Sequence, residues 1–272
     1  MISAAALTLM VSVFIASIVE TVEAFTIVLA MGLTRNWKSA LAGAGAALVM
    51  LGITATAIML ILELFMSQIQ SLESLLQLII GVLLIIFGMQ WLRKAILRSS
   101  GLKAIHDEEI IFERERQAAL NAKPEKRLGL DWFAFVVSFK GVFLEGVEVV
   151  FIVITFGLAA ATDRINPIEN AMLLAAMAAV IGALIVAIAG SIAHKPLSRV
   201  PENTMKYAVG LLLCTFGLYW SVEGLGFFHV ESQSLHWPLG TWTLLLIFCA
   251  WLIVSRATIS ILKPIAQRKW AK

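Results

Sequence analysis

Seven long apolar runs constrain what this chain can fold into more than any other feature of its sequence. About 20 consecutive apolar residues are enough for a helix to cross the hydrocarbon core of a membrane. Only 14% of the 272 residues are charged, whereas soluble domains carry about 25%. The sequence therefore predicts an all-α integral membrane protein with seven transmembrane helices. These are expected at 4–33, 39–66, 74–92, 132–161, 169–193, 205–222 and 239–262.

The positions of Lys and Arg predict how the chain is oriented. If the N-terminus lies outside, 19 of the 21 Lys and Arg fall in inside segments or toward the inside ends of the spans, which leaves Arg164 outside and Lys140 within the fourth run. Such a bias indicates an outside N-terminus and a cytoplasmic C-terminus, in a multi-pass protein expected in the plasma (inner) membrane. No Lys or Arg precedes Arg35, so we expect the first run to be a permanent span rather than a cleaved signal.

A sequence pattern in the third run recurs in the sixth. Gly81, Phe87-Gly88 and Trp91 reappear 129 residues later as Gly210, Phe216-Gly217 and Trp220. A repeat of three spans must insert upside down the second time, and transporters built in this way place their sites near the membrane midplane. We expect a first three-helix repeat at 1–92, a charged cytoplasmic connector at 93–131 and an inverted second repeat at 132–222. The outside loop, seventh helix and basic cytoplasmic tail follow at 223–272.

Two pairs of glutamates lie within apolar runs, where an ionisable group costs several kcal/mol unless it is paired, hydrated or bound to a cation. Glu20 and Glu23 are in the first run, and Glu145 and Glu148 follow in the fourth run at an offset of 125 residues. Residues three apart share a helix face, so two such helices would bring four carboxylates together. Hard cations bind oxygen ligands of this kind. A structural pairing of helices and a proton relay without metal are the alternatives.

Other charged residues are weaker candidates. Lys140 lies on about the same helix face as Glu148 and is a candidate counter-ion for the empty site. The outside loop before the seventh run offers a candidate site for outer cation capture, made of Glu223, His229, Glu231 and His236.

The segments around the glutamates resemble a known family. Leu144-Glu145-Gly146-Val147-Glu148 and Val19-Glu20-Thr21-Val22-Glu23 are similar to the Arg-Glu-Gly-Leu-Glu motif of the high-affinity iron permeases, which are oxidase-dependent iron transporters. The resemblance implies seven spans, iron coordination by the four glutamates, and an extracytoplasmic oxidase or iron-delivery protein as partner. Val19 and Leu144 stand where the family has arginine, which indicates a divergent member.

Together these features predict a membrane permease that moves a hard metal cation, with iron as the expected cargo and no permanently bound cofactor. The alternatives are an exporter or antiporter for Mn²⁺ or Ca²⁺, a proton-coupled transporter, and a non-transporting accessory subunit. The sequence has no nucleotide-binding loop, nucleophile elbow or zinc-protease spacing. We therefore expect neither an enzyme nor a nucleic-acid partner.

Overall fold

The chain is α-helical and is divided into two compact units. The computed structural model describes residues 4–68, 73–103, 108–161, 168–193, 202–228, 235, 237–240 and 242–270. Unit 1 comprises Met1–Leu62 and Asp107–Val200, and unit 2 comprises Glu63–His106 and Pro201–Lys272. Within the described residues, six helical segments are long and apolar enough to cross a membrane. The protein is therefore a multi-pass, all-α membrane protein.

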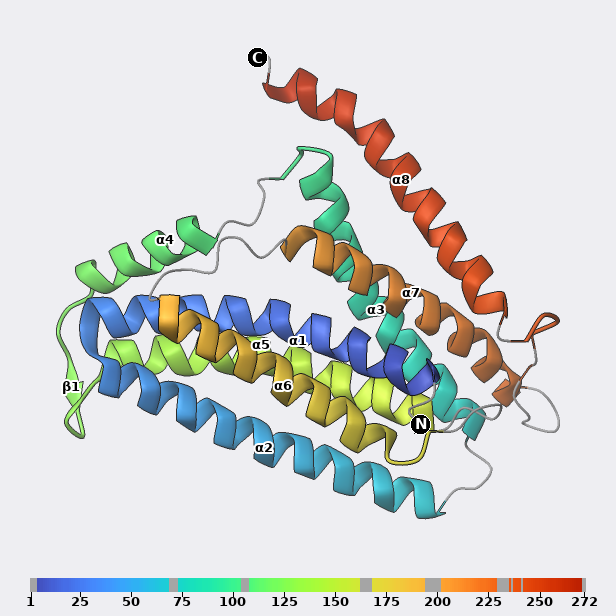
Figure 1. The fold of residues 1–272 in the computed structure, drawn as a ribbon, viewed down its shortest axis with the longest axis horizontal. Helices are drawn as coiled ribbons and strands as arrows, with labels where there is room; N and C mark the ends of the chain where they lie inside the picture. Colours follow the sequence, from blue (N-terminus) through green and yellow to red (C-terminus); the bar gives the residue numbers. More distant parts are fainter. Residues whose placement is uncertain are drawn as a thin grey trace. The chain divides into compact units, whose positions relative to one another are not determined.

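The first of these six segments, Ala6–Ile61, contains two helices. α1 (Ala4–Met31) passes into α2 (Trp37–Gln68) through a five-residue π-helix, η1 (Gly32–Asn36). Figure 1 shows that α1 and α2 run in opposite directions on either side of this junction. The expected polar loop near residue 35 is thus a helical turn.

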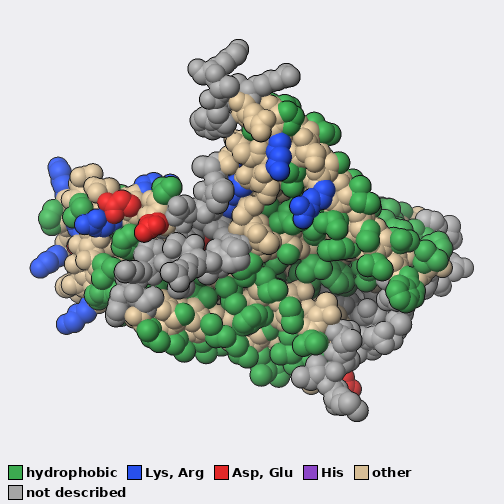
Figure 2. All heavy atoms as spheres, turned by 45° about the horizontal axis from the view of Figure 1, so that its top comes forward, with side chains coloured by type: hydrophobic (Ala, Val, Ile, Leu, Met, Phe, Trp, Pro, Cys, Tyr) green, Lys and Arg blue, Asp and Glu red, His purple; other side chains and the backbone are tan. Residues whose placement is uncertain are grey.

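Unit 1 continues with α4 (Glu108–Asn121), α5 (Trp132–Ala161) and α6 (Ala171–Ala193). A short hairpin of β1 (Lys126–Arg127) and β2 (Leu130–Asp131) precedes α5. The bounds of α5 coincide with the predicted fourth span. Charged side chains gather at the end of this unit where α4 and the hairpin lie, and hydrophobic side chains cover its long helices (Figure 2).

In unit 1, α6 packs against α1 and α5 packs against α2. α6 packs on α1, with Gly182 against Ser17 and Ile18. In the second contact, Leu51 of α2 packs against Gly146 of α5. The missing glycine side chains let these membrane helices approach closely.

The side chain of Arg35, in η1, contacts the segment that joins α4 to α5. Its guanidinium is 10% exposed and forms an ion pair with Asp131 at 3.0 Å. It also donates hydrogen bonds to the carbonyl oxygens of Ala119 and Ala122 at the end of α4. Asp131 in turn accepts from the amide of Ala134 in the first turn of α5. One half-buried arginine therefore joins η1, α4 and the start of α5.

The exposed face of α4 carries local charge pairs. Glu113 accepts hydrogen bonds from Arg116 and Gln117. These contacts, the one with Gln117 foremost, lower the pKa of the Glu113 carboxyl below its usual value. The predicted connector thus contains a solvated helix.

Unit 2 is built from α3 (Glu73–Ser99), α7 (Glu202–Gly224) and α8 (Trp242–Trp270), with a short 3-10 helix, η2 (Leu225–Phe228), after α7. α3 continues past the predicted end of the third span at residue 92. It does so because a helix keeps its backbone hydrogen bonds after the apolar run ends, and Arg93, Lys94 and Arg98 are good helix formers.

The repeated glycines form the contact between α3 and α7. A Cβ added to Gly217 would lie 2.9 Å from the carbonyl oxygen of Gly81, and one added to Gly210 would lie 3.3 Å from the carbonyl oxygen of Gly88. The positions in contact run in opposite directions along the two helices, which are therefore antiparallel. Any larger residue at Gly217 would force the helices apart.

Candidate metal centre in unit 1

The glutamates of α1 and α5 lie on faces that meet within unit 1. Gly141, near the start of α5, lies against Ile27, near the end of α1, and the later Glu145 lies beside the earlier Glu20 and Glu23, so α1 and α5 are antiparallel. Gly141 allows the close approach, because a Cβ there would lie 2.9 Å from Cδ1 of Ile27. This packing places Glu20 and Glu23 opposite Glu145.

Three of the four predicted ligands form a cluster. One carboxylate oxygen from each of Glu20, Glu23 and Glu145 lies within 4.8 Å of the others. Glu20 is fully buried, at 0% exposure, and the other two are half-buried. Carboxylates this close in a low-dielectric site repel one another unless a cation or protons neutralise them. The arrangement suits a hard cation, which binds oxygen at about 2.0–2.6 Å.

Glu148 lies outside this cluster. It is half-buried and one turn further along α5 than Glu145. The sequence pattern treats Glu145 and Glu148 alike, but the crossing of α1 over α5 brings only Glu145 to Glu20 and Glu23. The ligand role predicted for Glu148 stays a prediction.

Lys140, the candidate counter-ion, lies on a different face of α5 from Glu145, the member of the cluster on that helix. It is exposed, as are Val136, Leu144 and Val147 along the same stripe of the helix. Leu144 is the position where the resembling family has arginine, so Lys140 lies one turn from that position and on the same face. Its role as a counter-ion stays a prediction.

The candidate residues for outer capture are only partly described. Glu223 is half-buried near the end of α7, and its carbonyl oxygen accepts a hydrogen bond from the amide of Leu235 at 3.0 Å. His229, Glu231 and His236 lie outside the described residues.

Two buried serines extend the polar stripes and were not expected. Ser17 precedes Glu20 by one helical turn, and Ser138 precedes Glu145 by two. Among the described residues, neither hydroxyl oxygen has a hydrogen-bond partner, and an unsatisfied buried hydroxyl is costly. Their spacing from the glutamates, three and seven residues, is the sequence signal that could have marked them as further polar positions on the buried faces of α1 and α5.

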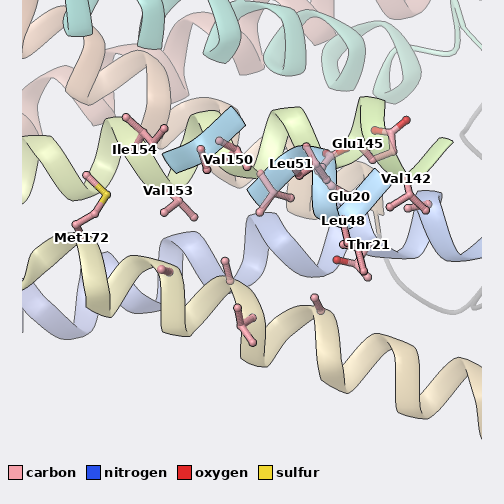
Figure 3. A pocket seen from close by; sticks show the side chains of 18 of the residues that line it. Glu20, Thr21, Leu48, Leu51, Val142, Glu145, Val150, Val153, Ile154 and Met172 are labelled. Carbon is pink, nitrogen blue, oxygen red and sulfur yellow. The ribbon is translucent and has the colours of Figure 1, made fainter. Parts of the chain in front are cut away.

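A cavity of about 410 Å³ adjoins the carboxylates. We call it the chamber. Figure 3 shows Glu20, Thr21 and Glu145 toward one end of the lining side chains and Met172 at the other. Apart from these polar side chains, the walls are aliphatic or small. They include Leu48, Leu51, Ala55 and Met59 from α2, Val149, Val150 and Val153 from α5, and Ala176, Ala179 and Ala183 from α6.

Comparisons with known proteins give no information on the function of this site. The chain matches no family model, no curated protein and no solved structure.

Proposed function

We propose that this protein is a membrane permease for a hard metal cation, which binds between α1 and α5 during its passage. The observation that carries the proposal is the cluster of Glu20, Glu23 and Glu145, whose oxygens lie within 4.8 Å of one another on apolar helices. Ionisable groups inside a membrane protein are expensive and commonly mark an ion pathway. The resemblance of both motifs to the iron permeases favours iron as the cargo, with Glu148 as a fourth ligand and an outside oxidase or iron-delivery partner.

The proposed topology has seven crossings, with the N-terminus outside and the C-terminus in the cytoplasm. The reversal of direction between α1 and α2 supports counting Ala6–Ile61 as two crossings. The distribution of Lys and Arg along the chain supports the orientation. Six carboxylates lie in or beside the outside segments of this topology against Arg164 alone: Glu63, Glu73, Asp163, Glu169, Glu223 and Glu231. This negative balance would raise the local concentration of cations.

The proposed architecture is a pair of inverted repeats, α1–α2–α3 and α5–α6–α7, followed by α8. An exchange at the offset of 129 residues converts the contact of Gly81 with Gly217 into that of Gly210 with Gly88, and both contacts are present. Unit 1 has the same reciprocity, because α6 packs on α1 and α2 packs on α5. In such proteins, movement of the repeats exposes the site to the two sides in turn.

The test is metal uptake into liposomes that contain the purified protein, measured separately with Fe²⁺, Fe³⁺, Mn²⁺ and Ca²⁺. We expect uptake by the wild type and its loss in both Glu23→Gln and Glu145→Gln. Glu113→Gln on the exposed face of α4 is the matched control and should transport normally. Unchanged uptake in both cluster variants would eliminate the assigned site. Uptake of Mn²⁺ or Ca²⁺ without iron would replace the cargo, and wild-type protein with no uptake of any ion would favour an accessory subunit.

A further inference from the structure

Two exposed cations lie on one face of α8, the last helix of unit 2. Arg256 and Lys263 are both exposed, and a separation of seven residues places two side chains on almost the same face of a helix. Ser260 and Gln267 are exposed on this face as well. We call these four residues the basic stripe of α8.

Large aliphatic side chains flank the basic stripe, and each is more than half exposed. They are Ile253, Val254, Ile261 and Ile265. α8 is also long and apolar enough to cross a membrane. A surface that combines cations with exposed aliphatic groups on such a helix suits an amphipathic partner that lies in the bilayer.

Arg256 lies within the part of α8 that crosses the membrane. It follows Trp242, the first residue of α8, by 14 residues, and a helix needs about 20 residues to cross the hydrocarbon layer. A cation that faces hydrocarbon is costly, and long basic side chains reach toward the headgroup layer instead. The phosphate of a lipid headgroup is the anion that this layer offers to Arg256.

The guanidinium of Arg256 is held in place without being neutralised. Its Cζ lies 5.6 Å from the centroid of the Tyr207 ring, and the Tyr207 hydroxyl lies 2.6 Å from Oγ of Ser255. Among the residues that the structure describes, neither Arg256 nor Lys263 forms an ion pair. A guanidinium stacked on an aromatic ring keeps its N–H groups available for bidentate hydrogen bonds to a phosphate.

The surrounding end of unit 2 is also strongly basic. The chain just after α3 reaches the end of α8, since a Cβ at Gly101 would lie 3.7 Å from Cβ of Ala266. The sequence segments that form this end are 91–103, 202–210 and 251–267. They contain seven Lys or Arg and one acidic residue, Glu202. Figure 2 shows Lys and Arg side chains on unit 2 beside hydrophobic ones. Basic groups beside a membrane helix attract anionic lipids.

We propose that the basic stripe of α8 binds an anionic phospholipid, with Arg256 and Lys263 at its phosphate and its acyl chains along the exposed aliphatic face of the helix. A helix rises about 10 Å over seven residues, so the two long side chains can converge on an anion beside Ser260. A soluble anion would match the cations but not the aliphatic flanks. The stripe lies in unit 2 and the carboxylate cluster in unit 1, so this inference does not depend on the proposed metal function.

The test measures lipid binding to the purified full chain in detergent by native mass spectrometry. The probes are dioleoyl phosphatidylglycerol, dioleoyl phosphatidylcholine and inorganic phosphate. We expect phosphatidylglycerol to bind at least fivefold more tightly than phosphatidylcholine, and inorganic phosphate in excess should not displace it. A basic residue beside an anionic lipid is worth about a factor of five in affinity. Arg256→Gln and Lys263→Gln should each lower the preference by about this factor, and together they should remove it.

Two matched comparisons separate the basic stripe from general positive charge. Ser260→Glu places a carboxylate between the two cations and should remove the preference, whereas Ser260→Gln should keep it. Lys38→Gln combined with Lys126→Gln removes two exposed charges from unit 1 and should also keep it. All of these positions are exposed, so the helix content measured by circular dichroism should match that of the wild type and show that the variants are folded.

Three results would overturn the inference. Equal affinity for the two lipids would show that the stripe does not recognise the anionic headgroup. An equal loss of preference in the double variant of unit 1 would show that only net charge matters. Displacement of phosphatidylglycerol by inorganic phosphate would assign the stripe to a soluble anion.

Discussion

Replacing Glu145 with glutamine should make the metal-free protein more stable and remove its response to metal. The change keeps the side-chain volume nearly constant and deletes one charge from the cluster. Two unit charges 4.8 Å apart repel by about 3.5 kcal/mol at an effective dielectric constant of about 20. Without metal, Glu145→Gln should therefore unfold at a higher temperature than the wild type.

The assay is thermal unfolding of detergent-solubilised protein with and without Mn²⁺. An ion at about 100 times its dissociation constant stabilises the folded state by about 2.7 kcal/mol. For chains of this size, 1 kcal/mol shifts Tm by about 2–4 °C. We therefore expect Mn²⁺ to raise the wild-type Tm by about 5–10 °C and to leave that of Glu145→Gln unchanged.

The change in Tm on addition of Mn²⁺ also serves for the control variant and for the result that would refute the site. Glu113→Gln removes an exposed carboxylate from α4 and should leave the Mn²⁺ response intact. If Glu145→Gln responds to Mn²⁺ as the wild type does, the cluster is not a metal site. If Glu145→Gln without metal is no more stable than the wild type, the carboxylates do not repel one another as their spacing implies.

Two further changes test the packing and the connector. Gly217→Leu should lower Tm by several degrees, because the new side chain would meet the Gly81 carbonyl of α3. Gly52→Leu is the control and should leave Tm unchanged, because a Cβ at Gly52 meets nothing within 4 Å. Equal Tm values for the two variants would contradict the α3–α7 contact. Arg35→Ala should increase hydrogen exchange and proteolysis in α4, because it removes the ion pair with Asp131 and the contacts at the end of the helix. Arg116→Ala deletes only an exposed ion pair, which contributes little to stability, so equal exchange in the two variants would refute the role of Arg35.

The apolar pattern predicted the membrane helices well, and the range of α5 was predicted to the residue. The predicted end of the third helix, at residue 92, was wrong. Hydropathy gives the length of the apolar run, whereas the helix continues beyond that run through Arg93 and Arg98. The junction at Arg35 also differs from the expected loop, because the backbone stays helical while the chain reverses.

The site was less predictable than the helices. Periodicity places Glu145 and Glu148 on one face of α5, but it does not give the angle at which α1 crosses that face. The chamber depends on the placement of four helices and on small residues such as Ala176, so no local pattern indicates it. The exposure of Lys140 has the same cause, since the buried side of a membrane helix is set by its neighbours.

The reciprocal packing of α1 with α5 and α6 has a consequence for biosynthesis. Glu20 and Glu23 are translated about 125 residues before Glu145, which at about 5–20 residues per second corresponds to about 6–25 s. Throughout that interval the insertion machinery holds α1 without the helices that later cover its carboxylates. A charged side chain at the centre of a lone helix disfavours insertion by about 2.5–3.5 kcal/mol. α1 is therefore made before α5 and α6 but packed only after them, so its final place in the membrane depends on the later helices.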